Sequence, residues 1–137
     1  MVLEENFFLE DMLPNALMNP LSEADLAAYR RPYLEPGEAR RPTLVWPREL
    51  PIGGEPADVT EIVCAAARWL AGASVPKLLI RAEPGAILMG KALETCRAWP
   101  NQHEVDVPAK HYVPEDSPDH VGRAVAAWYR ALPTSAD

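Results

Sequence analysis

Three histidines, the side chains best suited to move protons near neutral pH, lie in the last third of this 137-residue chain. They are His103, His111 and His120, and their spacing places no two of them one helical turn apart. No cysteine–histidine cluster accompanies them, so the sequence gives no support to a metal site. The histidines are therefore candidates for acid–base chemistry.

His111 differs from the other two in its surroundings. A short strand expected at His103–Val107 precedes it, and a helix expected to open at Ser117–Pro118 follows it. In open α/β sheets the working groups gather at the carboxyl ends of strands, so a histidine there can serve as a general base. A solvated loop histidine is the alternative, and the residues alone leave it open. His103 and His120 are expected to be solvated surface residues.

Acids near these elements have simpler interpretations. Glu83 follows the other expected strand and could orient a histidine, but the Glu83–Gly85 stretch is also typical of a tight turn with a surface carboxylate. The acids Glu115, Asp116 and Asp119 are explained by the dipole of the last helix. No Gly-x-Ser-x-Gly elbow occurs, and no aspartate with small neighbours stands between a strand and a helix. The chain is therefore expected to lack the nucleophile.

Regular elements dominate the second half of the chain. The pattern predicts helices at Asp58–Leu70 (opened by an Asp58/Glu61 capping box), at Met89–Trp99 and from Ser117, and strands at Val75–Ile80 and His103–Val107. Alternating helices and strands are typical of parallel βαβ units. Two strands are too few for a parallel sheet, whose faces and edges need cover. We therefore expect an α/β fold from which sheet neighbours are missing.

The first half is rich in proline and short of long elements. We expect one short helix at Val2–Asp11, stopped by Pro14, and a second from the cap Ser22 to Pro32. The stretch 33–56 is expected to be a connection without regular structure. The aromatic residues of this half, Phe7, Phe8 and Trp46, belong either to a core or to the lining of an apolar pocket.

Composition narrows the class of partners. The chain has 20 acidic and 13 basic residues and a formal charge of -7, which disfavours nucleic acid and anionic membrane surfaces as partners. No apolar run approaches the ~18 residues that span a bilayer. The first ten residues lack the basic start of a signal peptide, and two cysteines make no disulfide framework, so a reducing, cytoplasmic location is expected. The tail 134–137 is expected to be disordered.

Five motifs in order carry a resemblance to a known family. They are Tyr29–Tyr33, Gly37–Ile52, Ala82–Ala86, Trp99–Gln102, and His111–Tyr112 with Glu115–Asp119. Together they resemble the passage from cap to core in haloalkane dehalogenases, above all those of the hexachlorocyclohexane-degrading type. A coelenterazine-using luciferase shares the same passage, so the motifs identify the branch better than the reaction.

The resemblance implies a fold and a division of the chain. The fold is α/β, the C-terminal portion of an α/β-hydrolase with its last parallel strands and flanking helices and with part of the helical cap. Residues 1–53 correspond to the partial cap and residues 54–137 to the C-terminal part of the core. The sheet neighbours that the pattern lacks then belong to the part of the family fold that precedes this passage.

The resemblance also implies a mechanism. In the family an aspartate attacks the carbon that carries the halogen, and a histidine then activates water to hydrolyse the ester. Only that histidine falls in this chain, as His111; the aspartate, the halide-binding residues and the orienting acid do not, and Gly85 occupies the place where some relatives carry the acid. By position, the substrate-binding residues are Phe8, Ala16, Trp46, Pro47, Leu50, Ala86, Ile87 and Tyr112.

These implications define the expected activity and its alternatives. The expected ligands are a small halogenated aliphatic substrate and a halide ion, with no cofactor and no metal, in a reaction that detoxifies halogenated compounds. Alone, the chain is expected to be inactive. The alternatives are a non-catalytic remnant that pairs its exposed strand with an N-terminal complementary segment or with its own copy, and a luciferase-like oxygenase or an epoxide or ester hydrolase.

Overall fold

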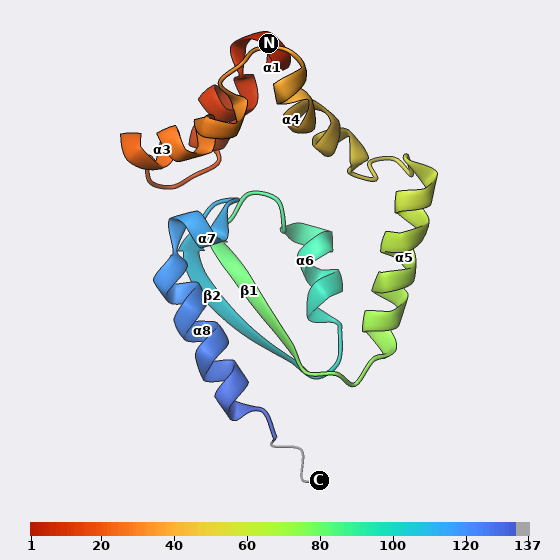
Figure 1. Cartoon of the computed structure of the whole chain (residues 1–137). Coiled ribbons are helices and arrows are strands. Elements are labelled where there is room, and N and C mark those ends of the chain that lie inside the picture. Colours follow the sequence, from red (N-terminus) through yellow and green to blue (C-terminus); the bar gives the residue numbers. More distant parts are fainter. Residues whose placement is uncertain (134–137) are drawn as a thin grey trace. The chain divides into compact units, whose positions relative to one another are not determined.

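The computed structural model describes residues 1–133 as two compact units, Met1–Ala67 and a second unit that begins at Arg68 (Figure 1). The boundary between them falls inside the long helix α5 (Ala57–Gly72). The predicted division at residues 53 and 54 concerns cap and core, and it stays a prediction. The predicted disorder of the tail 134–137 lies outside the described residues.

Short helical elements build the first unit (Figure 1). Its α-helices before α5 are α1 (Val2–Glu5), α2 (Leu13–Asn15), α3 (Glu23–Arg30) and α4 (Arg41–Val45). Four other helical turns join them: η1 (Phe8–Met12, a π-helix) and the 3-10 turns η2 (Arg31–Tyr33), η3 (Glu38–Arg40) and η4 (Trp46–Glu49). Leu9 of η1, Leu13 of α2 and Leu17 just after α2 recur every four residues, and all three are buried.

The single helix predicted for Val2–Asp11 is wrong. Asn6 ends α1 because its backbone adopts the left-handed conformation, with φ 54° and ψ 36°. Asparagine tolerates this region better than most residues, which the spacing of apolar residues does not reveal. Pro14, predicted to stop the helix, lies in the first turn of α2, where its missing N–H is not needed.

The start of α3 is confirmed. The hydroxyl of Ser22 accepts the backbone N–H of Asp25 at 3.1 Å, which satisfies one donor of the first helical turn. The helix ends at Arg30, before Pro32. A capping serine followed by an acid three residues later was therefore a sufficient local signal.

The stretch 33–56, predicted to lack regular structure, contains η3, α4 and η4. Pro42 and Pro47 lie in the first turns of α4 and η4, so these prolines start helical turns instead of preventing them. The elements are too short for a period to be visible in the sequence.

A buried arginine ties this unit together. The side chain of Arg40 is 8% exposed, and its guanidinium donates hydrogen bonds of 2.6–3.1 Å to four backbone carbonyl oxygens, those of Leu3, Glu4, Tyr33 and Leu34. A guanidinium carries five donors and keeps its charge, so it costs little to bury when so many are satisfied. The start of the chain is thereby fixed to the stretch that precedes α4.

A parallel two-stranded sheet organises the second unit. Strands β1 (Lys77–Pro84) and β2 (Gln102–Ala109) pair over their full lengths, and α6 (Gly90–Arg97) lies in the connection between them. The one-turn helix α7 (Val113–Asp116) and the helix α8 (Pro118–Ala131) follow. The predicted order of helix, strand, helix, strand and helix is confirmed.

Two details of the second half differ from prediction. Helix α5 begins at Ala57, so Asp58 lies inside its first turn and does not cap it; the N–H of Thr60 bonds to Pro56 O at 3.0 Å. Strand β1, predicted to be buried, is only half-buried, because in the described part of the chain it has one neighbour, β2. The sequence thus predicts that α5 and β1 form, but it predicts neither the capping of α5 nor the burial of β1.

The two faces of the sheet differ in polarity. On one face Arg81 donates through Nε and Nη2 to the carboxylate of Asp106, the residue paired with it across the ladder, at 2.7 Å each. Arg97 of α6 forms an ion pair with Glu104 on this face. Alternation along β2 places Val105, Val107 and Ala109 on the other face, where Val107 and Ala109 are buried.

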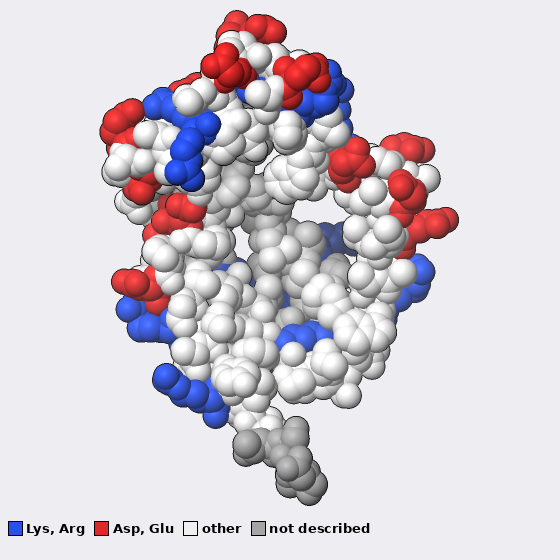
Figure 2. Space-filling view, viewed as in Figure 1, with Lys and Arg blue, Asp and Glu red and all other residues white. Residues whose placement is uncertain are grey.

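Large apolar side chains are exposed in both units. Among the described residues only Leu9, Leu13, Leu17, Val107 and Ala109 form the fully buried apolar core. Much of the surface in Figure 2 carries no charged side chain. None of the described helices has the length and apolar character needed to cross a membrane.

Candidate active site

The carboxyl ends of β1 and β2 bring two loops together. The ladder ends with Pro84 opposite Ala109, and the N–H of Gly85 donates to Ala109 O at 3.0 Å. The loop after β1 then carries Ala86 and Ile87, and the loop after β2 carries His111 and Tyr112. These four residues, all assigned to the site from sequence, therefore follow neighbouring positions at one edge of the sheet.

His111 lies in the loop between β2 and α7, and its side chain is exposed. Its ring contacts that of Tyr112 at a centroid distance of 4.7 Å and an interplanar angle of 52°. Tyr112 is half-buried, and the loss of water around its hydroxyl raises the pKa of that phenol above the ordinary value. The imidazole of His111 thus has an aromatic ring as a neighbour.

Two side chains that follow His111 hold its loop. The carboxylate Oδ2 of Asp116 accepts the backbone N–H of Lys110 at 2.9 Å, and the hydroxyl of Ser117 donates to Pro108 O at 2.6 Å. Ser117 stands at the start of α8 as predicted, but its hydroxyl makes this bond instead of a cap. The sequence predicts Asp116 and Ser117 only as residues at the start of a helix. It does not reveal their contacts with Lys110 and Pro108, because no periodic pattern links these positions.

Glu83 is engaged by an arginine. Its carboxylate forms an ion pair with Arg81, and its side chain is 61% exposed. This agrees with the interpretation as a surface carboxylate in a turn. Glu83 is therefore a poor candidate for the acid that orients His111.

The remaining predicted site residues belong to the first unit. Phe8 begins η1 and Ala16 follows α2, and both are half-buried. Trp46 and Pro47 form η4, and Leu50 follows it; Trp46 is 62% exposed and Leu50 50% exposed. The turn η4 and the residue after it thus expose an aromatic and an aliphatic side chain.

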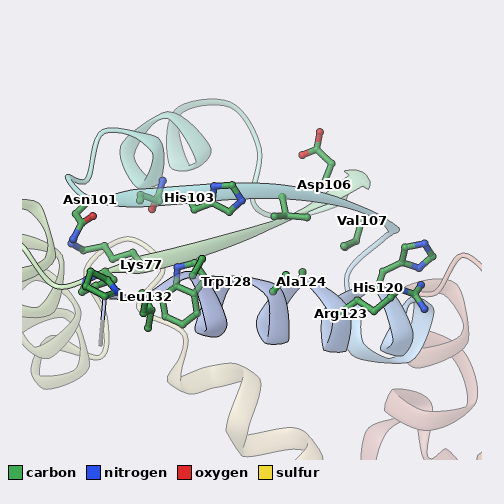
Figure 3. A pocket seen from close by; sticks show the side chains of 16 residues that line it. Lys77, Asn101, His103, Asp106, Val107, His120, Arg123, Ala124, Trp128 and Leu132 are labelled. Atoms are coloured by element: carbon green, nitrogen blue, oxygen red, sulfur yellow. The ribbon is translucent and has the colours of Figure 1, made fainter. Parts of the chain in front are cut away.

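A groove of about 690 Å³ opens elsewhere in the second unit, between β2 and α8 (Figure 3). Trp128, Ala124 and Leu132 of the α8 side and Val107 of β2 supply apolar walls. Asp106 points away from α8, toward Arg81. The groove contains none of the residues assigned to the site from sequence, although His103 and His120, both exposed as predicted, line it.

No group of three histidine, cysteine or acidic side chains in residues 1–133 is arranged to hold a metal ion. The candidate groups in the loops after β1 and β2 are instead an imidazole, a phenol and two apolar residues. Such a set can take a proton from water and contact an apolar substrate, and it contains no attacking group of its own.

Comparison with known proteins places this arrangement in context. The chain is 53% identical over 132 residues to a haloalkane dehalogenase of Sphingobium indicum, and 48% identical over 134 residues to one of Mycolicibacterium smegmatis. The chain is homologous to the haloalkane dehalogenases. The match covers 96% of the chain in both cases, but 45% and 43% of the relatives, so the chain spans less than half their length. No protein-family model matches it.

Solved structures support the same relationship. The crystal structure of a haloalkane dehalogenase from Bradyrhizobium elkani matches with a TM-score of 0.86 and 43% identity, over 95% of this chain and 45% of that one. The fold class predicted from sequence, a portion of an α/β-hydrolase, is thereby confirmed. A coelenterazine h 2-monooxygenase of Renilla reniformis is also similar, with 42% identity over 131 residues, 93% of this chain and 42% of the relative.

Proposed function

We propose that this chain carries the water-activating half of a haloalkane dehalogenase site, with His111 as the general base. The observation that carries the proposal is the 53% identity to a haloalkane dehalogenase across nearly the whole chain. The position of His111 supports it, because His111 follows β2 at the edge of the sheet where β1 also ends. The substrate class is a small halogenated aliphatic compound.

In the proposed reaction an aspartate outside residues 1–137 displaces the halide and forms an alkyl ester. His111 then removes a proton from water, which attacks the ester carbonyl and releases the alcohol. The net change is R–X and water to R–OH, halide and a proton, and no cofactor takes part. The substrate would contact Tyr112 beside the histidine, Ala86 and Ile87 in the loop after β1, and Phe8, Ala16, Trp46, Pro47 and Leu50 in the first unit.

The nucleophile would come from a complementary segment that pairs with the free edge of β1. Parallel sheets are stable when strands and helices cover their edges and faces, and in the described residues β1 pairs with β2 alone. Without that segment the chain is expected to be inactive. A cytoplasmic location and a role in detoxification belong to the same proposal, and the free thiols of Cys64 and Cys96 fit a reducing compartment.

Halide release tests the proposal. The full chain is mixed with the part of the Sphingobium indicum enzyme that it does not match, and halide is measured with 1-bromobutane and 1,2-dibromoethane. We expect turnover from the mixture, no turnover from either part, and loss of turnover with His111→Gln. Turnover by the chain alone would contradict the missing nucleophile, and an active His111→Gln mixture would contradict the role of the histidine.

The Renilla relative favours one alternative, an oxygenase that acts on coelenterazine. The same mixtures discriminate it when they are given coelenterazine and monitored for light. Light emission without halide release would support the oxygenase. An ester or an epoxide substrate added to the same mixtures tests the hydrolase alternatives.

A further inference from the structure

The loop that carries His111 is closed by contacts from both of its ends. Upstream, β2 ends at Ala109, which is fully buried, so the chain enters the loop from a fixed point. Downstream, the backbone N–H groups of Glu115 and Asp116 both donate to Tyr112 O at 3.0 Å, which makes α7 a single tight turn. His111 lies between these two fixed parts.

Two side-chain bonds join the two ends to each other. Asp116 Oδ2 accepts the N–H of Lys110, the residue before His111, and Ser117 Oγ donates to Pro108 O. Ser117 is 4% exposed, so water does not compete with its bond. A carboxylate that accepts a backbone N–H makes a charge-assisted bond, stronger than a neutral one. Together the bonds fix the backbone immediately before the imidazole.

We propose that Asp116 and Ser117 are positioning residues for His111, with the Asp116 carboxylate holding the Lys110 N–H as the main restraint. The inference rests on the proposed function for its catalytic consequence, but the restraint itself is a property of this loop. A misplaced base loses rate steeply, with about 100-fold for an error near 1 Å. Substrate binding would change little, because neither side chain is among the residues assigned to the substrate.

The first test measures, in the full chain, how far the bond to Asp116 protects the Lys110 N–H from amide hydrogen exchange. Asp116→Ala should speed the exchange of the Lys110 N–H about tenfold, since one hydrogen bond is lost. Asp116→Asn keeps an acceptor oxygen at the same place and should restore most of the protection. Asp119→Ala, an exposed acid in the first turn of α8, is the matched control and should leave the rate unchanged.

The second test measures kcat and KM for halide release by the mixture with the complementary segment. Asp116→Ala should lower kcat by about 10- to 100-fold with KM nearly unchanged, and Asp116→Asn should recover most of kcat. If the unsubstituted mixture releases no halide, the proposed function fails, while the exchange experiment still decides whether Asp116 holds the loop. Unchanged exchange in Asp116→Ala, or an asparagine variant as impaired as the alanine variant, would overturn the inference.

Discussion

At the scale of single residues, the turn after β1 depends on the glycine at position 85. Gly85 has a φ of 73°, and a Cβ built on it would meet Ala82 O at 2.9 Å. Both the backbone conformation and the space therefore require glycine. This position cannot accept a side chain without moving the turn.

Replacing Gly85 by alanine should destabilise the second unit. We expect a loss of about 1–3 kcal/mol in the free energy of unfolding, since the variant combines a strained φ with a close backbone contact. Urea unfolding followed by circular dichroism measures it. Gly90→Ala is the matched control, because Gly90 also has a positive φ, 52°, but nothing lies within 4 Å of its Cβ position. An equal loss in both variants would show that the contact with Ala82 contributes nothing.

Arg40 should be the most sensitive polar residue of the first unit. Arg40→Met removes the donors of four backbone carbonyl oxygens, and we expect a loss of at least about 3 kcal/mol in the free energy of unfolding. Proteolysis at increasing urea concentration, read at sites in residues 1–67, measures it. Arg41→Ala is the control: Arg41 is exposed and, within residues 1–133, its ion-pair partner is Glu38, so little change is expected. Equal resistance of both variants would contradict the structural role of Arg40.

At the scale of elements, the sequence predicts those whose own period or caps identify them. The spacing of Val121, Val125 and Trp128 predicts α8, and the apolar run before Arg81 predicts β1. The elements it misses depend on single-residue backbone conformations or on distant partners. Asn6 breaks the first helix, and the contacts of Arg40 with residues more than thirty positions earlier order the stretch before α4.

Some features of the candidate site can likewise be predicted from the sequence, and others cannot. A histidine after a strand is visible in the sequence, because strand ends carry functional groups in parallel sheets. The roles of Asp116 and Ser117 are not visible, because each contact spans a loop with no period. The engagement of Glu83 by Arg81 also depends on which side chains share one face of the sheet.

The charged face of the sheet should make stability depend on pH. The hydrogen bonds from Arg81 hold the pKa of Asp106 below its ordinary value of 3.8, and Arg97 lowers that of Glu104 below 4.5. Carboxylates with depressed pKa values stabilise the folded state above the pKa of the unfolded chain. This stabilisation should therefore be complete above about pH 5 and lost as the pH falls below 4.

The variant Arg81→Gln tests this pH dependence. It should lower the urea midpoint at pH 7 and narrow the difference between the midpoints at pH 7 and pH 3, because the carboxylate of Asp106 loses its main partner. Salt should weaken the effect, since these groups are partly exposed to solvent. Arg123→Gln on α8 serves as the control of equal charge. An unchanged difference between the two pH values in Arg81→Gln would contradict the assignment.

At the scale of the whole molecule, the described residues bury too little apolar surface for their number. Five apolar residues are fully buried, whereas Ile52, Ile62, Trp69, Ile87 and Tyr129 are more than 60% exposed. Helix α5 is 16 residues long and has no buried residue. Helices in proteins are stabilised mainly by packing of an apolar face, and exposed apolar patches mark interaction sites. A partner that covers α5 is therefore expected.

The last prediction concerns that partner. Alone, the chain should bind a hydrophobic dye and elute above its monomer mass of 15.1 kDa, because exposed apolar surface and a free strand edge favour self-association. Adding the complementary segment of the Sphingobium indicum enzyme should reduce dye binding and give a one-to-one complex. Ile62→Glu on α5 should weaken that complex, and Arg68→Ala on the same helix should not. A compact monomer that binds neither dye nor segment would show that these residues fold on their own, and the proposal of a shared active site would fail with it.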